Sequence, residues 1–206
     1  MPYGKETLLI LAAYAVGCFT TGYYLVRWWT GTDVRASGSG SVGATNVGRV
    51  MGRPGFFLTV LGDFSKGVFA VWLAEYFQLR PVAAVLAMLA AVIGHIWPAQ
   101  LRFHGGKGVA TGLGALLICN HLMAFTFVPV LLVLWTGIRN FVLAGMAAFT
   151  ILPLVAFGLD LPLDTVFGLS ALAVLILIAH RKNIPDEIAK LIAERKLKGE
   201  KRAVPK

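Results

Sequence analysis

Long apolar runs are the feature that most limits how this chain can fold. Seven of them lie at residues 7–26, 55–78, 81–98, 109–119, 121–137, 140–158 and 162–180. A helix of about 20 residues crosses the hydrocarbon core of a bilayer, so seven such helices would use about 140 residues and leave only short loops. The 206 residues are 57% hydrophobic and 14% charged, against about 45–50% and about 25% in soluble domains. These values nearly exclude a soluble enzyme and predict an all-α, polytopic membrane protein.

The number of spans does not follow from hydropathy alone. The run at 109–119 is too short to cross a bilayer, and residues 109–135 also read as one long tilted helix. The polar, glycine-rich segments follow the first, third and last runs, and they share one side of the membrane only if the number of spans is odd. The sequence therefore predicts seven transmembrane helices with 109–119 as a partial span. Such a span is tolerated where its glycine-rich start is buried in protein or lines a polar cavity.

The basic residues predict the orientation of these spans. Because cationic loops favour the cytoplasm, we expect the amino terminus outside and the carboxyl terminus inside. The glycine-rich segments then lie on the cytoplasmic face of the cell (inner) membrane. That face holds Arg27, Arg35, Arg49, Arg53, Arg102, Lys107, Arg139 and the carboxyl-terminal tail.

The carboxyl-terminal tail differs from the rest of the chain. We divide the protein into one transmembrane domain, 1–183, and a basic cytoplasmic tail, 184–206. From Arg181 onward nine Lys/Arg stand against four Asp/Glu, which supplies +5 of the total net charge of +9. Apolar residues recur on one helical face of the tail. The tail is therefore predicted to be an amphipathic helix held at anionic lipid headgroups.

A segment rich in glycine and serine, residues 35–49, follows the first run. Glycines let successive backbone N–H groups turn toward an anion, and a guanidinium suits bidentate contact with phosphate. A flexible linker is the alternative, but linkers do not usually end in Ala-Thr-Asn and an arginine beside a bilayer. We expect a phosphate site formed by Ser39, Gly40, Thr45, Asn46 and Arg49.

A second glycine-rich segment, residues 105–108, precedes the short run. The Lys107 ammonium and the N–H groups at the helix start can address the same anion. This is not a Walker A loop, because Gly108 stands where that motif needs Ser or Thr. The alternative is a cytoplasmic anchor, which would not need the flanking glycines. We expect Gly105, Gly106, Lys107 and Gly108 to bind a phosphate.

Further ionisable and polar residues border these segments. His180, Arg181 and Asn183 follow the last run, and His180 and Asn183 share a helix face because they are three residues apart. Asp63 and Lys66, also three apart, lie inside the second run. Ionisable residues are costly there and usually pair or face a polar cavity. We expect an ion pair that borders the site.

Metal and disulfide chemistry have no support in the sequence. His95, His104 and His180 lack a carboxylate at a spacing typical of a metal site. Cys18 and Cys119 both lie in apolar stretches, where two cysteines do not form a disulfide framework. We expect no metal and no other cofactor.

These motifs together resemble the bacterial membrane glycerol-3-phosphate acyltransferase family called PlsY, over nearly the whole chain. The resemblance rests on Gly38-Ser39-Gly40, Gly43-Ala44-Thr45-Asn46, Asp63-Phe64-Ser65-Lys66-Gly67, Gly94-His95 with Pro98, Gly105-Gly106-Lys107-Gly108-Val109-Ala110-Thr111 and His180-Arg181-Lys182-Asn183-Ile184. It implies seven transmembrane helices and an acyl-phosphate donor, without acyl-CoA or acyl carrier protein. Ser41 stands where the family pattern has Asn, and an insertion displaces the family's ending to the stretch that closes on Glu200.

The resemblance implies transfer of a fatty acyl group from acyl phosphate to the 1-hydroxyl of sn-glycerol 3-phosphate. The products are lysophosphatidate, an early intermediate of phospholipid synthesis, and phosphate. We assign catalytic roles to Ser39, Lys107, His180 and Asn183, and supporting roles to Asp63, Lys66, His95 and Arg181. The proton of the attacking hydroxyl goes to His180 or to a substrate phosphate, and the sequence does not choose between them.

A transporter or channel for phosphate or a phosphorylated solute is the alternative from a different class. Transporters also bind anions at the ends of broken helices, but inverted repeats are expected there and none is found in this sequence. We expect the two substrates and membrane lipid as partners, no nucleic acid, and a functional monomer.

Overall fold

The structure, a computed structural model, describes residues 4–203, with side chains described up to residue 196. Within that range every regular element is helical. Glu200, which the resemblance singled out, lies outside the described side chains. The elements are α1 (Gly4–Cys18), α2 (Thr21–Thr30), η1 (Val34–Ala36), α3 (Ala44–Tyr76), α4 (Pro81–Ile96), η2 (Ala99–Leu101), α5 (Val109–Cys119), α6 (His121–Ile138), α7 (Phe141–Gly158), α8 (Leu163–His180) and α9 (Ile184–Ala203).

Six segments of the described chain are long and apolar enough to cross a membrane. They are Gly4–Thr30, Ala44–Tyr76, Pro81–Leu101, His121–Ile138, Phe141–Gly158 and Leu163–His180. The apolar helix α5 has 11 residues and rises only about 16 Å, roughly half of a bilayer core of about 30 Å. These findings confirm the prediction of an all-helical, multi-pass membrane protein.

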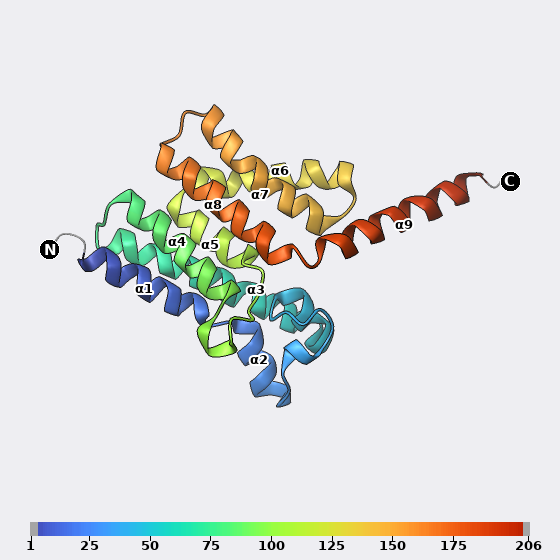
Figure 1. Cartoon of the computed structure of the whole chain (residues 1–206), viewed down its shortest axis with the longest axis horizontal. Helices are drawn as coiled ribbons and strands as arrows, with labels where there is room; N and C mark the ends of the chain where they lie inside the picture. Colours follow the sequence, from blue (N-terminus) through green and yellow to red (C-terminus); the bar gives the residue numbers. More distant parts are fainter. Residues whose placement is uncertain (1–3, 204–206) are drawn as a thin grey trace.

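The helices pack side by side into one bundle, and α9 projects from the end of the bundle where α8 ends (Figure 1). Small residues allow the closest contacts. A Cβ atom on Gly67 of α3 would lie 2.1 Å from the carbonyl oxygen of Thr111 in α5. One on Gly17 of α1 would lie 2.1 Å from the carbonyl oxygen of Ala91 in α4. Such close approach of backbones at small residues is usual between helices in membranes.

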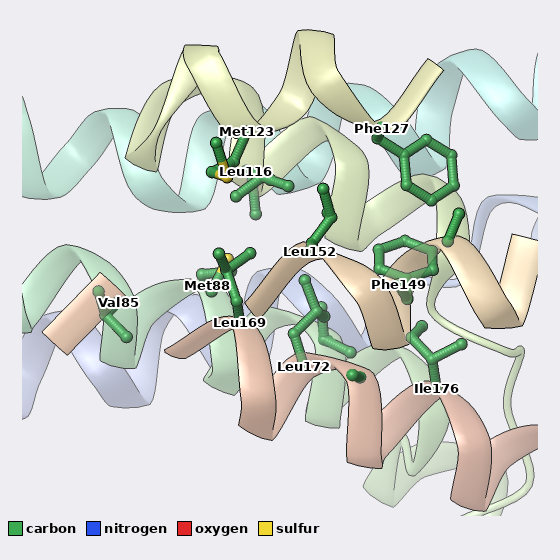
Figure 2. Close-up of a cluster of buried hydrophobic side chains, with 14 of the residues drawn as sticks. Val85, Met88, Leu116, Met123, Phe127, Phe149, Leu152, Leu169, Leu172 and Ile176 are labelled. Atoms are coloured by element: carbon green, nitrogen blue, oxygen red, sulfur yellow. The ribbon is translucent and has the colours of Figure 1, made fainter. Parts of the chain in front are cut away.

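The largest apolar core holds the short helix α5 in place. Figure 2 shows Leu116 of α5 among side chains from its neighbours, including Met88 of α4, Leu152 of α7 and Leu172 of α8. Each of these side chains is almost fully buried. A helix that is only about half as long as a bilayer core is thick is therefore fixed by packing against neighbours that are long enough to cross it.

Two helical segments of the structure differ from the predicted apolar runs: one is broken and the other is kinked. The first run, 7–26, is not one helix, because α1 ends at Cys18 and α2 begins at Thr21. The second run begins earlier than predicted: α3 starts at Ala44 and is kinked at Gly52, whose φ is 69° and ψ −164°. Glycine adopts this conformation readily because it has no Cβ. The glycine- and serine-rich segment 35–49 is therefore helical from Ala44 onward.

Candidate functional site

A cavity of about 320 Å³ lies where the predicted motifs meet. It is formed by the loop before α3, the first turns of α5 and α7, the middle of α3 and the ends of α4 and α8. Its polar lining is Ser39, Ser41, Thr45, Asn46, Asp63, His95, Lys107 and His180. Its apolar lining includes Phe56, Val60, Phe64, Val109, Leu113, Phe141, Val142 and Met146. The cavity thus offers polar groups that suit an anion and apolar side chains that suit a hydrocarbon chain.

Asn46 organises the loop that carries Ser39. Its Oδ1 accepts a hydrogen bond from the Ser39 backbone N–H at 2.9 Å, and its Nδ2 donates to the carbonyl oxygens of Val34, Ser37 and Ser41 at 2.9–3.0 Å. The Asn46 side chain is buried. We predicted it as a phosphate ligand, but its amide is occupied by the loop. Its role in the structure is to fold the segment so that Ser39, Ser41 and Thr45 line the cavity.

Two other residues of this predicted phosphate site do not line the cavity. Gly40 has a φ of 69° and supplies a left-handed turn that a side chain would strain. Arg49 lies in the first turns of α3, with its guanidinium 3.5 Å from the Oδ1 of Asn46. It therefore stands directly behind the loop, on the segment that precedes the kink at Gly52.

The glycines before Lys107 serve close packing. The N–H of Gly105 donates to Ile96 and that of Gly106 to His95, both at backbone carbonyl oxygens 3.0–3.1 Å away. A Cβ on Gly106 would lie 2.0 Å from the Nε2 of His95. We predicted these two glycines as phosphate ligands, but their amides are already paired inside the protein. Their absence of side chains lets the turn lie directly on His95.

Lys107 lines the cavity beside the start of α5. Gly108 has a left-handed φ of 79° and begins the helix, whose first-turn N–H groups have no helical acceptor. The ammonium and these N–H groups therefore address the same space. Burial lowers the pKa of Lys107 below its ordinary value; Glu187 opposes this shift, and Arg49 and Lys190 add to it.

His180 closes the cavity at the end of α8. Its Nδ1 lies 2.8 Å from the carbonyl oxygen of Ile176. Because a carbonyl only accepts hydrogen bonds, Nδ1 carries the proton, and Nε2 of the neutral ring is an acceptor. His180 is 4% exposed and lines the cavity.

The residues that follow His180 do not line the cavity. Asn183 donates its backbone N–H to the carbonyl oxygen of His180 at 2.7 Å and accepts from the N–H of Glu187. It thus joins α8 to α9. The Arg181 guanidinium is exposed and donates to the carbonyl oxygen of Ile178.

The ionisable residues inside the second run are paired. The Nζ of Lys66 lies 3.1 Å from the Oδ1 of Asp63 and 2.8 Å from the Nδ1 of His95. Asp63 and His95 line the cavity, whereas Lys66 lies behind them. All three side chains are buried. Among the described residues, no group of three or more His, Cys, Asp or Glu side chains could hold a metal ion.

A contact that was not predicted from the sequence links α9 to the cavity wall. The Oδ1 of Asn140 accepts from the N–H of Leu143 and caps α7, while its Nδ2 donates to the Glu187 carboxylate at 2.9 Å. Phe141 and Val142, in the first turn of α7, form part of the apolar wall. The signal present in the sequence was an Asn at the very start of an apolar run, which is typical of a helix N-cap.

Comparison with known proteins supports the resemblance. A family model described as "Glycerol-3-phosphate acyltransferase" matches residues 7–190. Glycerol-3-phosphate acyltransferase 1 of Desulfitobacterium hafniense (strain Y51) is 44% identical over 90% of this chain and 92% of that protein. Glycerol-3-phosphate acyltransferase of Alkaliphilus metalliredigens (strain QYMF) is 39% identical over 86% of this chain and 89% of that protein.

Solved structures show the same fold. The crystal structure of PlsY (YgiH), described as an integral membrane glycerol 3-phosphate acyltransferase in the glycerol 3-phosphate form, covers 91% of this chain and 94% of its own. It has a TM-score of 0.83 and is 32% identical. The lysophosphatidic acid form has a TM-score of 0.80. This chain therefore belongs to the PlsY family of integral membrane glycerol-3-phosphate acyltransferases, enzymes of phospholipid synthesis.

Proposed function

We propose that this acyltransferase moves a fatty acyl group from acyl phosphate to the 1-hydroxyl of sn-glycerol 3-phosphate. The observation that carries the proposal is the mixed lining of one cavity, which holds Lys107 and Ser39 together with apolar side chains that include Phe141 and Met146. Both substrates bring a phosphate and one brings a hydrocarbon chain. The glycerol 3-phosphate and lysophosphatidic acid forms of the related crystal structures support the acceptor and the product.

Each part of the cavity has a role in this reaction. Lys107 and the start of α5 hold one phosphate, and Ser39 holds the other, with the positive charge of Arg49 behind its loop. His180 orients the glycerol moiety, and Asn183 supports it by fixing the end of α8. Because acyl phosphate is a mixed anhydride with a good leaving group, positioning and charge stabilisation supply the acceleration.

The chemical step balances without a cofactor. The 1-hydroxyl oxygen attacks the acyl carbonyl carbon, the bond from that carbon to the phosphate oxygen breaks, and phosphate leaves with the electron pair. The hydroxyl proton goes either to the Nε2 of His180, the acceptor that the bond to Ile176 leaves free, or to a substrate phosphate oxygen. A His180→Ala variant separates the two. A near-normal kcat with a raised KM for glycerol 3-phosphate assigns the proton to the phosphate.

We also propose a topology for the chain in the membrane. Seven segments traverse or enter the bilayer, with α5 as the partial span and the amino terminus outside. The cavity then opens on the cytoplasmic side of the cell membrane, because the segments around it carry the basic residues. The enzyme acts as a monomer.

The tail is proposed to bind the membrane surface. Ile188 and Ile192 of α9 are four residues apart and 43% and 50% exposed, so they form one apolar strip on the helix. Arg195 and Lys196 follow the strip one turn further along the helix. An apolar strip with cations beside it suits a surface of anionic lipid.

One assay tests the proposed reaction. The purified protein, given palmitoyl phosphate and glycerol 3-phosphate, should form lysophosphatidate and phosphate in equal amounts. Palmitoyl-CoA is the matched control donor and should give no product. Product from acyl-CoA but not from acyl phosphate would overturn the proposed donor. Uptake of glycerol 3-phosphate into proteoliposomes without acyl transfer would favour the transporter alternative.

A further inference from the structure

The break between α1 and α2 leaves backbone groups without helical partners inside an apolar span. Side chains from distant parts of the chain take their place. Lys66 donates to the carbonyl oxygens of Gly17 and Phe19, 2.9 and 2.7 Å away, and Gln100 donates to that of Cys18. An unpaired polar group is costly in a bilayer. These contacts therefore stabilise a break that the local sequence, without glycine or proline at 18–21, does not explain.

The other side of the break is paired by Asp63. Its Oδ1 accepts from the N–H of Thr21, the first residue of α2, at 3.3 Å. The carboxylate thus stands at the positive end of α2, and the Lys66 ammonium stands at the negative end of α1. The Asp63 and Lys66 side chains are only 4% and 6% exposed. Removing one partner of a buried ion pair strongly destabilises a protein, because the other charge stays buried and unpaired. The break between α1 and α2 therefore requires both Asp63 and Lys66.

The same ammonium determines the protonation of His95. Two carbonyl oxygens and the Asp63 carboxylate surround Nζ within 3.1 Å, an environment that favours the protonated, donor-only form of lysine. An ammonium has three N–H groups: two donate to these carbonyl oxygens and the third donates to the Nδ1 of His95 at 2.8 Å, while the Asp63 carboxylate balances the charge. Nδ1 must be the unprotonated nitrogen of the ring, and Nε2 carries the proton.

The Nε2–H of His95 lies under the turn that carries Lys107. Gly106 packs on Nε2 so closely that a Cβ would lie 2.0 Å from it, and the backbone N–H of Gly106 donates to the carbonyl oxygen of His95. His95 also lines the cavity with Asp63. The His95 imidazole, with its Nε2–H in a fixed position, thus forms the part of the cavity wall below the turn that carries Lys107.

We propose that Asp63, Lys66 and His95 are positioning residues for acyl transfer. The Lys66–Asp63 pair fixes the break between α1 and α2, and Lys66 holds His95 as an Nε2–H donor below the Lys107 turn. Together the three residues form a preorganised part of the cavity wall against which the substrate phosphate binds, and none of them changes its charge during the reaction. This role rests on the acyl transfer proposed above, and it assigns a reason for each of the three buried side chains.

Two histidine variants separate the two ring nitrogens. His95→Gln keeps an amide N–H near the position of Nε2, whereas His95→Asn keeps a polar group near Nδ1 only. We expect His95→Asn to lose about 100-fold in kcat/KM, the effect of a misplaced group in an active site, and His95→Gln to retain most of the activity. Arg80→Gln, which removes the ion pair with Glu6 at the opposite end of the bundle, is the matched control and should match the wild type.

The role of the Lys66–Asp63 ion pair is tested by replacing both residues at once, so that no unpaired charge remains buried. Lys66→Met alone leaves the Asp63 carboxylate buried and unpaired, which destabilises the fold, so the double variant Asp63→Asn/Lys66→Met is the informative one. We expect it to fold, as measured by size-exclusion chromatography in detergent, and to lose about 100-fold in kcat/KM. Activities within about twofold of the wild type for the folded double variant and for His95→Asn would overturn the proposal.

A spectroscopic measurement tests the tautomer independently of activity. The chain has 4 histidines, so ¹⁵N-labelled histidine gives a small set of signals, and His95→Gln assigns the one from His95. We expect an Nε2–H tautomer in the wild type and its loss in the double variant. An Nδ1–H tautomer in the wild type contradicts the inference. Failure of the wild type to use palmitoyl phosphate contradicts the proposed donor instead, and leaves this measurement valid.

Discussion

Lys107 is the residue whose environment makes the clearest prediction. Burial lowers its pKa, and the carboxylate of Glu187 opposes that shift. The protonated form binds phosphate, so binding is lost as the pH rises through the lowered pKa. Glu187→Gln removes the opposing charge and lowers the pKa of Lys107 further. We expect the KM for glycerol 3-phosphate to begin rising at a lower pH in this variant, which steady-state kinetics from pH 7 to 10 measures.

Three further variants control this pH dependence. Lys107→Arg keeps its charge at every pH used, so its KM should no longer rise in the alkaline range. Lys107→Ala should lose about 100-fold or more in kcat/KM, as expected for removal of a charged group at the site of developing charge, while remaining folded in detergent. Glu194→Gln removes an acid elsewhere on α9 and should leave the profile unchanged. An identical profile for Glu187→Gln and the wild type would contradict the electrostatic coupling.

The kink at Gly52 is the feature of a single element that most directly orients the site. It separates the turns of α3 that carry Thr45 and Arg49 from the longer part that carries Asp63. An alanine at φ 69° and ψ −164° costs about 1–3 kcal/mol. We expect Gly52→Ala to lower the melting temperature by several degrees, since each kcal/mol shifts it by about 2–4 °C. The kcat/KM for acyl transfer should fall because the amino-terminal turns move.

Gly137→Ala is the matched control for Gly52→Ala. Gly137 lies within α6, and a Cβ there has no neighbour within 4 Å. Alanine favours helix over glycine by about 1 kcal/mol, so this variant should keep or slightly raise the melting temperature. Equal melting temperatures for the two variants, measured by differential scanning fluorimetry, would show that the kink carries no strain for a side chain.

The comparison of these elements with the sequence shows what local patterns can predict. Hydropathy predicted the positions of the apolar helices because bilayer thickness sets their length. The break at 19–20 was missed because Lys66 and Gln100, which satisfy it, lie more than 40 residues away in the sequence. The start of α3 was missed because the Gly52–Pro54 segment is typical of a helix boundary, whereas the chain is helical on both sides of it.

The candidate site shows the same division at the level of side chains. Spacing and residue type selected Ser39, Lys107 and His180, and the structure brings them to one cavity. The roles of individual neighbours depended on partners that no local pattern reveals. Asn46 has the composition of a phosphate ligand, but its amide is fully used by three carbonyl oxygens and one N–H of its own loop.

At the scale of the whole molecule, the residues that line the cavity show which ends of the helices lie on the same side of the bundle. It joins residues at the end of α4 and α8 with residues at the start of α3, α5 and α7. Arg80 and Glu6, at the start of α4 and α1, form an ion pair at the other end. Consecutive helices from α3 to α8 therefore alternate in direction, with α5 counted as one of them. An odd number of segments separates the two termini, so the proposed topology predicts opposite sides for them.

Reporter fusions test that topology. Green fluorescent protein fused after the carboxyl terminus should fluoresce, because it folds in the cytoplasm, and alkaline phosphatase at the same point should be inactive. The paired fusion at Asp160, in the turn between α7 and α8, should give the reverse result. The prediction follows from the surplus of cations at the cavity end, since the bilayer orients such ends toward the cytoplasm. Active phosphatase at the carboxyl terminus would place the cavity outside, away from any cytoplasmic supply of acyl phosphate.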